Sequence, residues 1–169
     1  GVRMASGSLG MGMSCGIGAA LTKKLNGESS LVYTLHGDGE LQEGQIWEAT
    51  MYAAANKVDN IIATVDVNGR QIDGDTDDVL ALGSLRAKFE AFGWKVFECD
   101  GNNLEDLLKT MAECKAATGK GVPVMNLMKT DMGMGVDHMM GSHKWHGIAP
   151  NDEQLAAALA QLPETIGDY

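Results

Sequence analysis

Apolar residues along this chain follow two alternating patterns. Short runs rich in β-branched and other apolar residues predict buried strands, whereas apolar positions spaced three and four residues apart predict helices. The predicted strands cover residues 31–35, 60–67, 94–99 and 122–128. The predicted helices cover residues 8–25, 43–56 and 80–92, a stretch from Asn102 or Asn103 to 117, and a last helix from Asn151 with Gln154 as its capping-box partner. A polar segment (71–78) and a Gly- and Met-rich loop (129–147) lie between these elements.

This alternation of strands and helices predicts an α/β fold. We expect three layers, with a mostly parallel sheet covered by helices on both faces, because parallel strands need crossover connections. The 169 residues suit a single domain, residues 1–169. Ligands of such sheets bind at the carboxyl ends of the strands, so the loops after Leu35, Val67 and Met128 form the candidate site.

Composition narrows the classes of protein to which the chain can belong. The formal net charge of −10 argues against nucleic-acid binding, which needs clustered Lys and Arg side chains. No apolar run reaches the roughly 18 residues needed to span a bilayer, so we expect a soluble protein with no membrane partner. The cysteines are widely spaced and form no C-x-x-C pair, which predicts neither disulfides nor a zinc site and favours the cytoplasm.

Two polar residues follow neighbouring predicted strands. Asp38 lies between Gly37 and Gly39 after the first strand, and Asn68 follows the second, far enough along the chain for a βαβ crossover. The glycines allow a large anion to approach the backbone, but a carboxylate alone would repel a phosphate. A divalent cation resolves this conflict, because Mg²⁺ prefers one or two carboxylates together with amide or carbonyl oxygens and substrate phosphates.

Each of these motifs also has an ordinary explanation. A lone Gly-Asp-Gly is usually a turn, and Asn-Gly is among the commonest turn dipeptides. The two motifs together, each at its own strand exit, favour a metal site much more strongly than either alone. A carbonyl one or two residues after Asn68, for which Arg70 is the first candidate, would complete the protein ligands.

The same motifs resemble the diphosphate-binding N-terminal part of transketolases, in particular the N-terminal subunit of split transketolases. These enzymes share a thiamine diphosphate-binding fold and combine a Gly-Asp-Gly motif with an asparagine one crossover later. The resemblance extends nearly from end to end of the chain. The matching stretches are GSLGMG (7–12), HGDGELQEGQIWEA (36–49), DVNGRQIDG (66–74) and GSHKWHG (141–147).

The resemblance implies a role for individual residues. Mg²⁺, which Ca²⁺ or Mn²⁺ can replace, would be bound by Asp38, Asn68 and the carbonyl of Arg70, and Gly37 and Gly39 would leave room for the diphosphate of thiamine diphosphate. The other implied cofactor contacts are Gly7, Leu9 and His146. His146 would lie near the reacting centre and is a catalytic candidate, with His143 as a secondary one.

Two acids on the second predicted helix have competing interpretations. By resemblance, Glu43 and Glu48 correspond to acids at the subunit contact, where facing carboxylates share protons or bind a water chain, and Glu43 is a catalytic candidate. Acids near the start of a helix are equally explained by the helix dipole, with both side chains solvated.

The activity implied by the resemblance is transfer of a two-carbon ketol unit from a ketose phosphate to an aldose phosphate. A C-terminal transketolase subunit with the pyrimidine-binding domain would be the partner, in a homodimer or heterotetramer. The chain begins just after the point where relatives carry histidines that contact substrate and cofactor, so we expect an N-terminally truncated domain that lacks its first elements. The alternatives are another thiamine diphosphate enzyme, such as a sulfosugar transketolase or a 1-deoxyxylulose-5-phosphate synthase-like protein, and a non-catalytic dimerisation or regulatory subunit.

Overall fold

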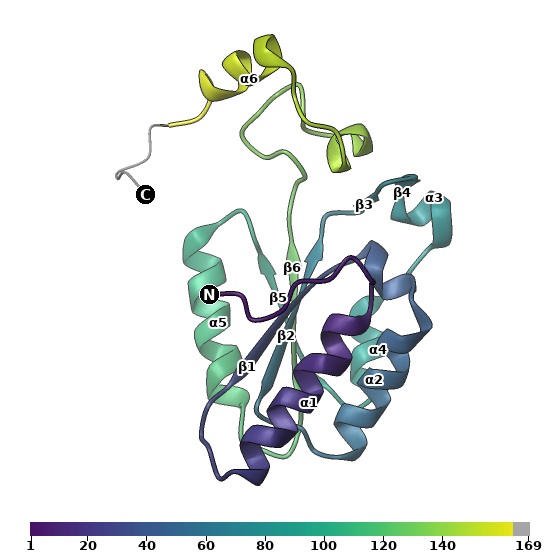
Figure 1. Ribbon diagram of the computed structural model, residues 1–169, viewed down its shortest axis with the longest axis vertical. Coiled ribbons are helices and arrows are strands. Elements are labelled where there is room, and N and C mark those ends of the chain that lie inside the picture. The colour runs from purple at the N-terminus through teal and green to yellow at the C-terminus, as the bar shows by residue number, and fades with distance from the viewer. Residues whose placement is uncertain (164–169) are drawn as a thin grey trace.

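A four-stranded parallel sheet forms the centre of the computed structural model, which describes residues 1–163 (Figure 1). The strand order is β1-β2-β6-β5, and every neighbouring pair is parallel. The strands are β1 (Val32–Gly37), β2 (Ile61–Val67), β5 (Lys95–Asp100) and β6 (Val124–Lys129). The predicted α/β fold is therefore confirmed, with each strand within a few residues of its predicted position.

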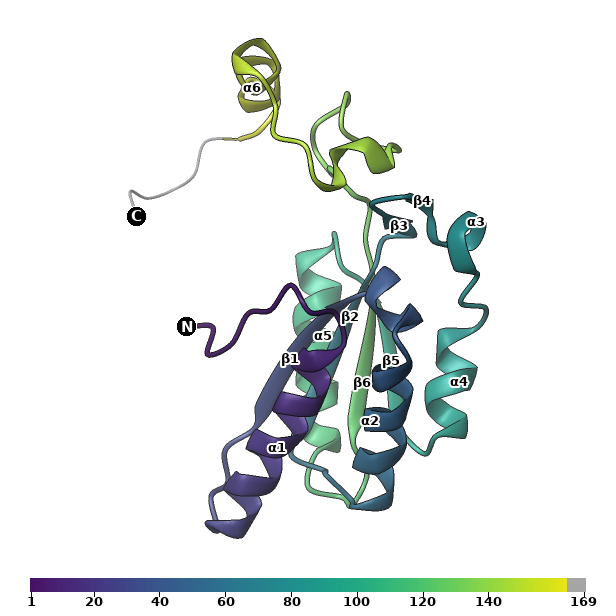
Figure 2. The same ribbon diagram turned by 45° about the vertical axis from the view of Figure 1, so that its right-hand side comes forward.

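Helices cover both faces of this sheet, as the turned view shows (Figure 2). One face carries α1 (Met11–Leu25), α2 (Gly44–Ala55) and α4 (Leu85–Ala91), and the other carries α5 (Leu104–Ala117). The predicted three-layer arrangement is correct. Within residues 1–163, no helix combines the length and apolar character needed to cross a membrane.

Local sequence signals explain where several helices begin. The Asn103 side chain caps α5 by accepting hydrogen bonds from the N–H groups of Glu105 and Asp106. Asn151 and Gln154 form the predicted capping box at the start of α6 (Asp152–Leu159). A cap of this kind contributes about 1 kcal/mol, which helps to fix the first residue of each helix.

The segment after β2 is more structured than predicted. A short hairpin of β3 (Arg70–Gln71) and β4 (Gly74–Asp75) is followed by the one-turn helix α3 (Thr76–Leu80). The prediction of one helix over 80–92 is wrong, because the chain breaks at Gly83, whose φ is +58°. The Ser84 side chain then caps α4 by accepting a hydrogen bond from the N–H of Ala87. Two 3₁₀ turns complete the structure, η1 (Gly39–Gln42) and η2 (His143–His146).

The first strand is less buried than predicted. Tyr33 and Leu35 of β1 are 52% and 70% exposed, respectively. The physical reason is the place of β1 at one end of the strand order. The helix α5 packs against β5 and β6, at the opposite end of that order. Side chains of β1 that point away from α1 therefore face solvent.

The main core lies between the sheet and the layer of α1, α2 and α4. Its largest fully buried side chains include Met13, Leu41, Ile46, Ile61 and Phe89. Each such side chain contributes about 1.5–3 kcal/mol by leaving water, so this layer fixes the sheet whose upper edge carries the candidate site.

Candidate functional site

The carboxyl ends of β1 and β2 meet at one edge of the sheet. Gly37 of β1 is in register with Asp66 of β2. Beyond this pair, the N–H of Asp38 donates a 3.1 Å hydrogen bond to the carbonyl of Asp66. The N–H of Gly69 donates a 2.6 Å hydrogen bond to Oδ2 of Asp38. The two loops that the sequence singles out therefore touch each other.

Asp38 is a buried carboxylate with no countercharge from residues 1–163. The residue is 2% exposed, and its Oδ1 accepts a 2.8 Å hydrogen bond from the N–H of Gly39. Burial raises the pKa of Asp38 above its usual range, against the hydrogen bonds from Gly69 and Gly39, and the nearby Asp66 carboxylate raises it further. In the described part of the chain, no Lys, Arg or His side chain forms an ion pair with Asp38.

Asn68 is held by its own turn. Its Nδ2 donates to Oδ2 of Asp66 at 3.3 Å, and its Oδ1 accepts from the N–H of Arg70 at 2.8 Å. The turn depends on Gly69, whose φ of +72° favours glycine. The Arg70 guanidinium binds Asp75 across the hairpin, so a role at this edge falls to the Arg70 backbone.

Asp66 and Thr130 belong to this edge but are not among the residues predicted from sequence. The hydroxyl of Thr130, just after β6, donates to Oδ1 of Asp66 and so ties the β6 exit to the β2 exit. Asp66 lies two residues before Asn68, near the end of β2, and its carboxylate accepts the hydrogen bond from the Asn68 side chain. This spacing is the sequence signal that identifies Asp66, whereas nothing local identifies Thr130.

The chemistry of these side chains fits a hard divalent cation. A carboxylate has about four lone-pair positions, and backbone N–H groups occupy only part of those on Asp38. An amide oxygen from Asn68 and a backbone carbonyl complete a set of oxygen ligands that Mg²⁺ prefers. No group of three or more His, Cys, Asp or Glu residues gathers within residues 1–163. Carboxylate and carbonyl oxygens suit Mg²⁺, Ca²⁺ or Mn²⁺.

The glycines on either side of Asp38 are explained differently. A Cβ at Gly37 would have nothing within 4 Å, so there is open space beside the backbone at this position. A Cβ at Gly39 would lie 3.0 Å from the Cβ of Gln71. The close approach of β3 is therefore a sufficient reason for glycine at position 39.

The loop before α1 lies against this edge. The N–H of Gly10 donates a 2.8 Å hydrogen bond to Oε1 of Glu40, and the Leu9 carbonyl accepts a 2.9 Å bond from Nε2 of Gln45. Gly7 and Leu9 are exposed, in keeping with a surface open to a ligand. The structure thus brings the predicted loop to the predicted turn.

Glu40 and His36 form a buried pair beneath this loop that the sequence interpretation missed. Oε1 of Glu40 lies 3.2 Å from Nδ1 of His36, whose side chain is 1% exposed. Oε2 of Glu40 accepts a 3.2 Å hydrogen bond from the N–H of Gly37. Burial alone would raise the pKa of Glu40, but the contact with His36 and the two backbone N–H groups outweigh it and lower the pKa.

His146 lies in η2, which packs on the β3–β4 hairpin. Its side chain is exposed and forms no hydrogen bond with Asp38 or Asn68 in the described structure. His143 and Lys144 of the same turn line a 250 Å³ pocket with Ile72. The structure therefore places the predicted histidine beside the hairpin that follows Asn68, on a loop that faces solvent.

Glu43 and Glu48 stay apart from the buried acids. Both are exposed on the helix that follows η1, and Glu43 occupies the N-cap position of α2 without a side-chain cap hydrogen bond. Exposure on α2 is compatible with a subunit contact and with solvation near a helix start, so both interpretations stay open.

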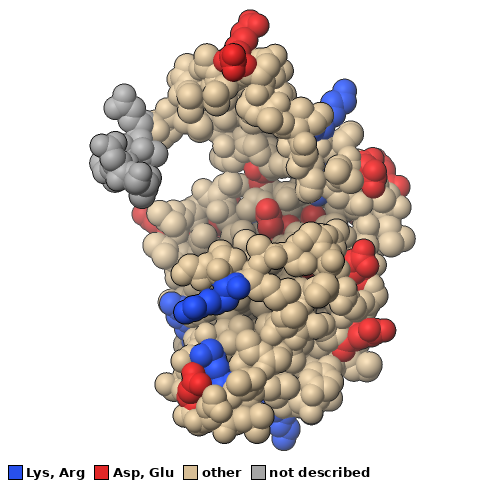
Figure 3. Space-filling model, viewed as in Figure 1, with Lys and Arg blue, Asp and Glu red and all other residues tan. Residues whose placement is uncertain are grey.

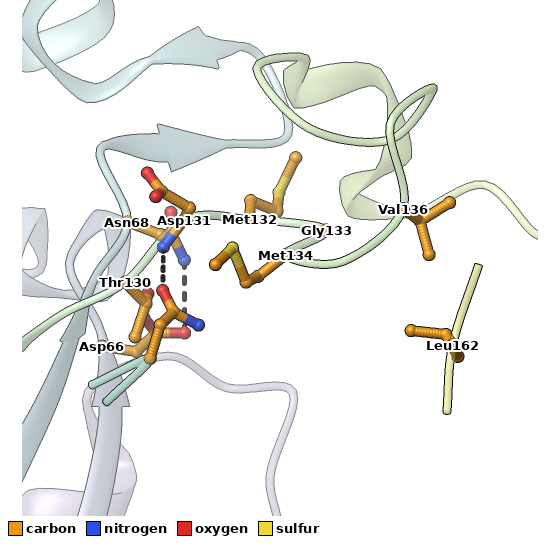
Figure 4. A pocket seen from close by; sticks show the side chains of 10 residues that line it. Asp66, Asn68, Thr130, Asp131, Met132, Gly133, Met134, Val136 and Leu162 are labelled. Carbon is orange, nitrogen blue, oxygen red and sulfur yellow. Dashed lines mark hydrogen bonds between the residues drawn. The ribbon is translucent and has the colours of Figure 1, made fainter. Parts of the chain in front are cut away.

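A pocket of 470 Å³ opens beside the Asp66–Asn68 pair (Figure 4). Its floor comes from the ends of β2 and β6, and its wall comes from the Met-rich loop. The space-filling view shows a hollow below the loops that follow β6, with acidic side chains inside it (Figure 3). The lining residues are Asp66, Asn68, Asn102, Thr130, Asp131, Met132, Gly133, Met134, Val136 and Leu162.

The fold and this edge define a parallel α/β domain whose ligand site lies at the carboxyl ends of its strands. Residues 1–163 match the family model of the transketolase, thiamine diphosphate binding domain. The chain belongs to this transketolase family. The family assignment made from the sequence motifs is thus confirmed.

Individual relatives agree with this assignment. The chain is 38% identical over 166 residues to a subunit of the apulose-4-phosphate transketolase from Phocaeicola vulgatus, covering 98% of this chain and 58% of the relative. It is 40% identical over 162 residues to the 6-deoxy-6-sulfo-D-fructose transketolase subunit SqwG from Clostridium sp., covering 96% and 58%. The chain therefore spans less than two thirds of the length of these relatives.

Solved structures show the same fold. A transketolase from Campylobacter jejuni superposes with a TM-score of 0.85 and 32% identity, over 95% of this chain and 26% of the other. A transketolase variant from Pichia stipitis superposes with a TM-score of 0.82 and 27% identity, over 94% and 25%.

Proposed function

We propose that the chain, as one domain over residues 1–169, binds the diphosphate of thiamine diphosphate through a Mg²⁺ held by Asp38, Asn68 and the Arg70 carbonyl. The observation that carries this proposal is the 2.6 Å hydrogen bond from the Gly69 N–H to Oδ2 of Asp38. It joins the exits of two strands at a carboxylate that is buried without a countercharge. Such a carboxylate is stabilised when a cation binds.

The residues around the proposed metal site also support binding of thiamine diphosphate. Gly37 leaves space beside Asp38, and the 470 Å³ pocket begins at Asn68. The loop of Gly7 and Leu9 closes one side through the contact of Gly10 with Glu40. These segments would bind and orient the cofactor, which supplies an electron sink for cleavage of a carbon–carbon bond.

We propose that residues on exposed segments donate hydrogen bonds to the substrate or share protons between subunits. His146, on the loop that follows β6, would donate a hydrogen bond to an oxygen of the bound sugar on which negative charge develops. Glu43 and Glu48, exposed on α2, would face a neighbouring chain of the assembly and share protons across that contact. Of the two acids, we propose Glu43 as the catalytic candidate, on the resemblance to the family motif.

The remaining parts of the active site would come from another chain. Two relatives are named as subunits, and we infer that this chain also works as a half-enzyme with a partner that carries the pyrimidine-binding domain. The assembly would be a homodimer or a heterotetramer. Cys15, Cys99 and Cys114 are free, which suits the reducing cytoplasm.

The proposed reaction is transfer of a two-carbon ketol unit from a ketose phosphate to an aldose phosphate. A second candidate donor is a 6-deoxy-6-sulfo-ketose, which is favoured by the 40% identity to the sulfofructose transketolase subunit. Parallel assays of the chain and its partner with a xylulose phosphate and with 6-deoxy-6-sulfo-D-fructose as donors distinguish the two, since the preferred donor will give the higher kcat/KM.

Calorimetric titration with thiamine diphosphate tests the cofactor site itself. Thiamine diphosphate is added to the full-length subunit in the presence of Mg²⁺, of EDTA, or of Ca²⁺ or Mn²⁺ in place of Mg²⁺. Each titration is done with and without the partner chain. We expect saturable binding that needs a divalent cation. Absence of binding under every condition would contradict the proposal and favour a non-catalytic dimerisation or regulatory subunit.

A further inference from the structure

The Glu40 carboxylate joins three segments of the cofactor edge. Oε1 accepts the N–H of Gly10 from the loop before α1, and Oε2 accepts the N–H of Gly37 from the end of β1. Glu40 itself belongs to η1, which begins directly after Asp38. One side chain thus connects the loop, the strand end and the turn of the metal ligand.

Both ends of this connection are closely packed. A Cβ on Gly10 would lie 2.6 Å from Cγ of Gln45, and the φ of Gly10 is +89°, so a larger residue at this position would be strained. At the other end, the Glu40 side chain is only 12% exposed. The ring of His36, a residue of β1, lies beside it and is almost fully buried, with Cε1 3.6 Å from where a Gly12 Cβ would be.

We propose that Glu40 is a positioning residue that sets the distance between the Gly7–Gly10 loop and the Asp38 turn, and so shapes the cofactor site without contacting the metal. This inference rests on the proposed function. The two carboxylates accept hydrogen bonds from the same turn. Glu40 accepts from the N–H of Gly37, and Asp38 accepts from the N–H of Gly39. Loss of Glu40 would release the loop and the first of these amides together.

The need for two acceptor oxygens predicts the order of variants. Glu40→Gln keeps one acceptor but turns an NH₂ group toward the other backbone N–H, so it will retain part of the connection. Glu40→Ala removes both acceptors. Glu113→Gln removes an acid from an exposed position on α5 and is the matched control.

Hydrogen–deuterium exchange measures the connection directly in the cofactor-free full-length subunit. We expect Glu40→Ala to speed exchange of the peptide that contains Gly10 by about tenfold, since each lost bond is to a charged acceptor. Glu40→Gln will lie between this variant and wild type, and Glu113→Gln will match wild type. Unchanged exchange in Glu40→Ala, with an unchanged Tm, would overturn the inference.

Calorimetry then tests the consequence for the cofactor in the complex with the partner chain. Residues that orient metal and cofactor ligands change affinity by about 10–100-fold, so we expect Glu40→Ala to raise the Kd for thiamine diphosphate at saturating Mg²⁺ within this range. Wild-type affinity in Glu40→Ala would overturn the inference while leaving the proposed function intact. Failure of wild type to bind would contradict the proposed function and with it the effect of Glu40 on the cofactor, whereas the exchange result would still decide whether Glu40 connects the loop to the turn.

Discussion

Asp38 and Asp59 lie at opposite ends of the parallel strands, after β1 and before β2, and have different partners within the chain. Asp59, before β2, accepts a 2.6 Å bond from Nζ of Lys24 and a 2.7 Å bond from the N–H of Gly121. Although burial alone would raise the pKa of Asp59, Lys24 and Gly121 lower it. Within the described residues, the Asp38 carboxylate has only backbone N–H partners, and burial raises its pKa.

The difference in partners indicates different roles. Asp59 is a structural acid, whereas Asp38 can accept an external ligand. The chain neutralises Asp59 with its own lysine, and that lysine also donates to the Lys57 carbonyl at 2.8 Å, which fixes the loop before β2. At the other end of the strands, the nearby Asp66 carboxylate adds to burial in raising the pKa of Asp38. A cation bound between these loops would remove a cost that the chain leaves uncompensated.

The largest effect expected from this comparison is on cofactor binding. Asp38→Asn removes the charged metal ligand, so we expect Mg²⁺-dependent binding of thiamine diphosphate to weaken by more than about 100-fold. Asp59→Asn removes the same charge at the other end of the strands and will change the Kd by less than about twofold. Calorimetry on both variants gives the comparison. Equal losses would mean that overall charge, and not a metal site, controls binding.

Stability in the absence of metal is expected to show the reverse order. Asp59→Asn weakens a charge-assisted pair and a backbone hydrogen bond, so the free energy of unfolding should fall by about 1.5 kcal/mol at pH 7. Asp38→Asn loses one acceptor but also relieves burial of a charge, so a change below about 1 kcal/mol is expected. Urea unfolding in EDTA measures both. A larger loss for Asp38→Asn would identify Asp38 as a structural acid as well.

The convergence at Asp38 was predictable because it follows from topology. Parallel strands end at the same edge, so a polar residue after each of two neighbouring strands must approach the other. The contact between Asp38 and Gly69 realises this expectation. The boundaries of α5 and α6 were equally accessible, since Asn103 and Asn151 cap them through local hydrogen bonds.

Features that depend on distant neighbours escaped the sequence interpretation. The run 31–35 is apolar, but its exposure depends on where α5 packs. The spacing of apolar residues in the sequence gives no information on that packing. Glu40 was not singled out, because its role depends on Gly10, which is remote in sequence. The β3–β4 hairpin lies in a segment too short and polar to show a strand pattern, and its docking depends on the 2.7 Å bond between Gln42 and Gln71.

The pH dependence of stability extends the comparison to acid conditions. Asp59 has a lowered pKa when folded, so its contribution is present above the unfolded pKa of about 3.9 and disappears as pH falls through the folded value. The difference in unfolding free energy between wild type and Asp59→Asn should therefore be constant from pH 7 to about 5 and shrink below about 4. Urea titrations across this range test it, and a gap that widens on acidification would contradict the sign.

The smallest expected effect concerns Lys24 alone. Its side chain is 39% exposed and that of Asp59 is 14% exposed, so solvent and salt screen their attraction. A double-mutant cycle with Lys24→Gln and Asp59→Asn should give a coupling energy of about 0.5 kcal/mol that decreases in 1 M salt. A coupling well above about 1 kcal/mol that resists salt would show that the pair behaves as buried. Asp59 would then be the acid that most needs its partner, and the contrast with Asp38 would be sharper still.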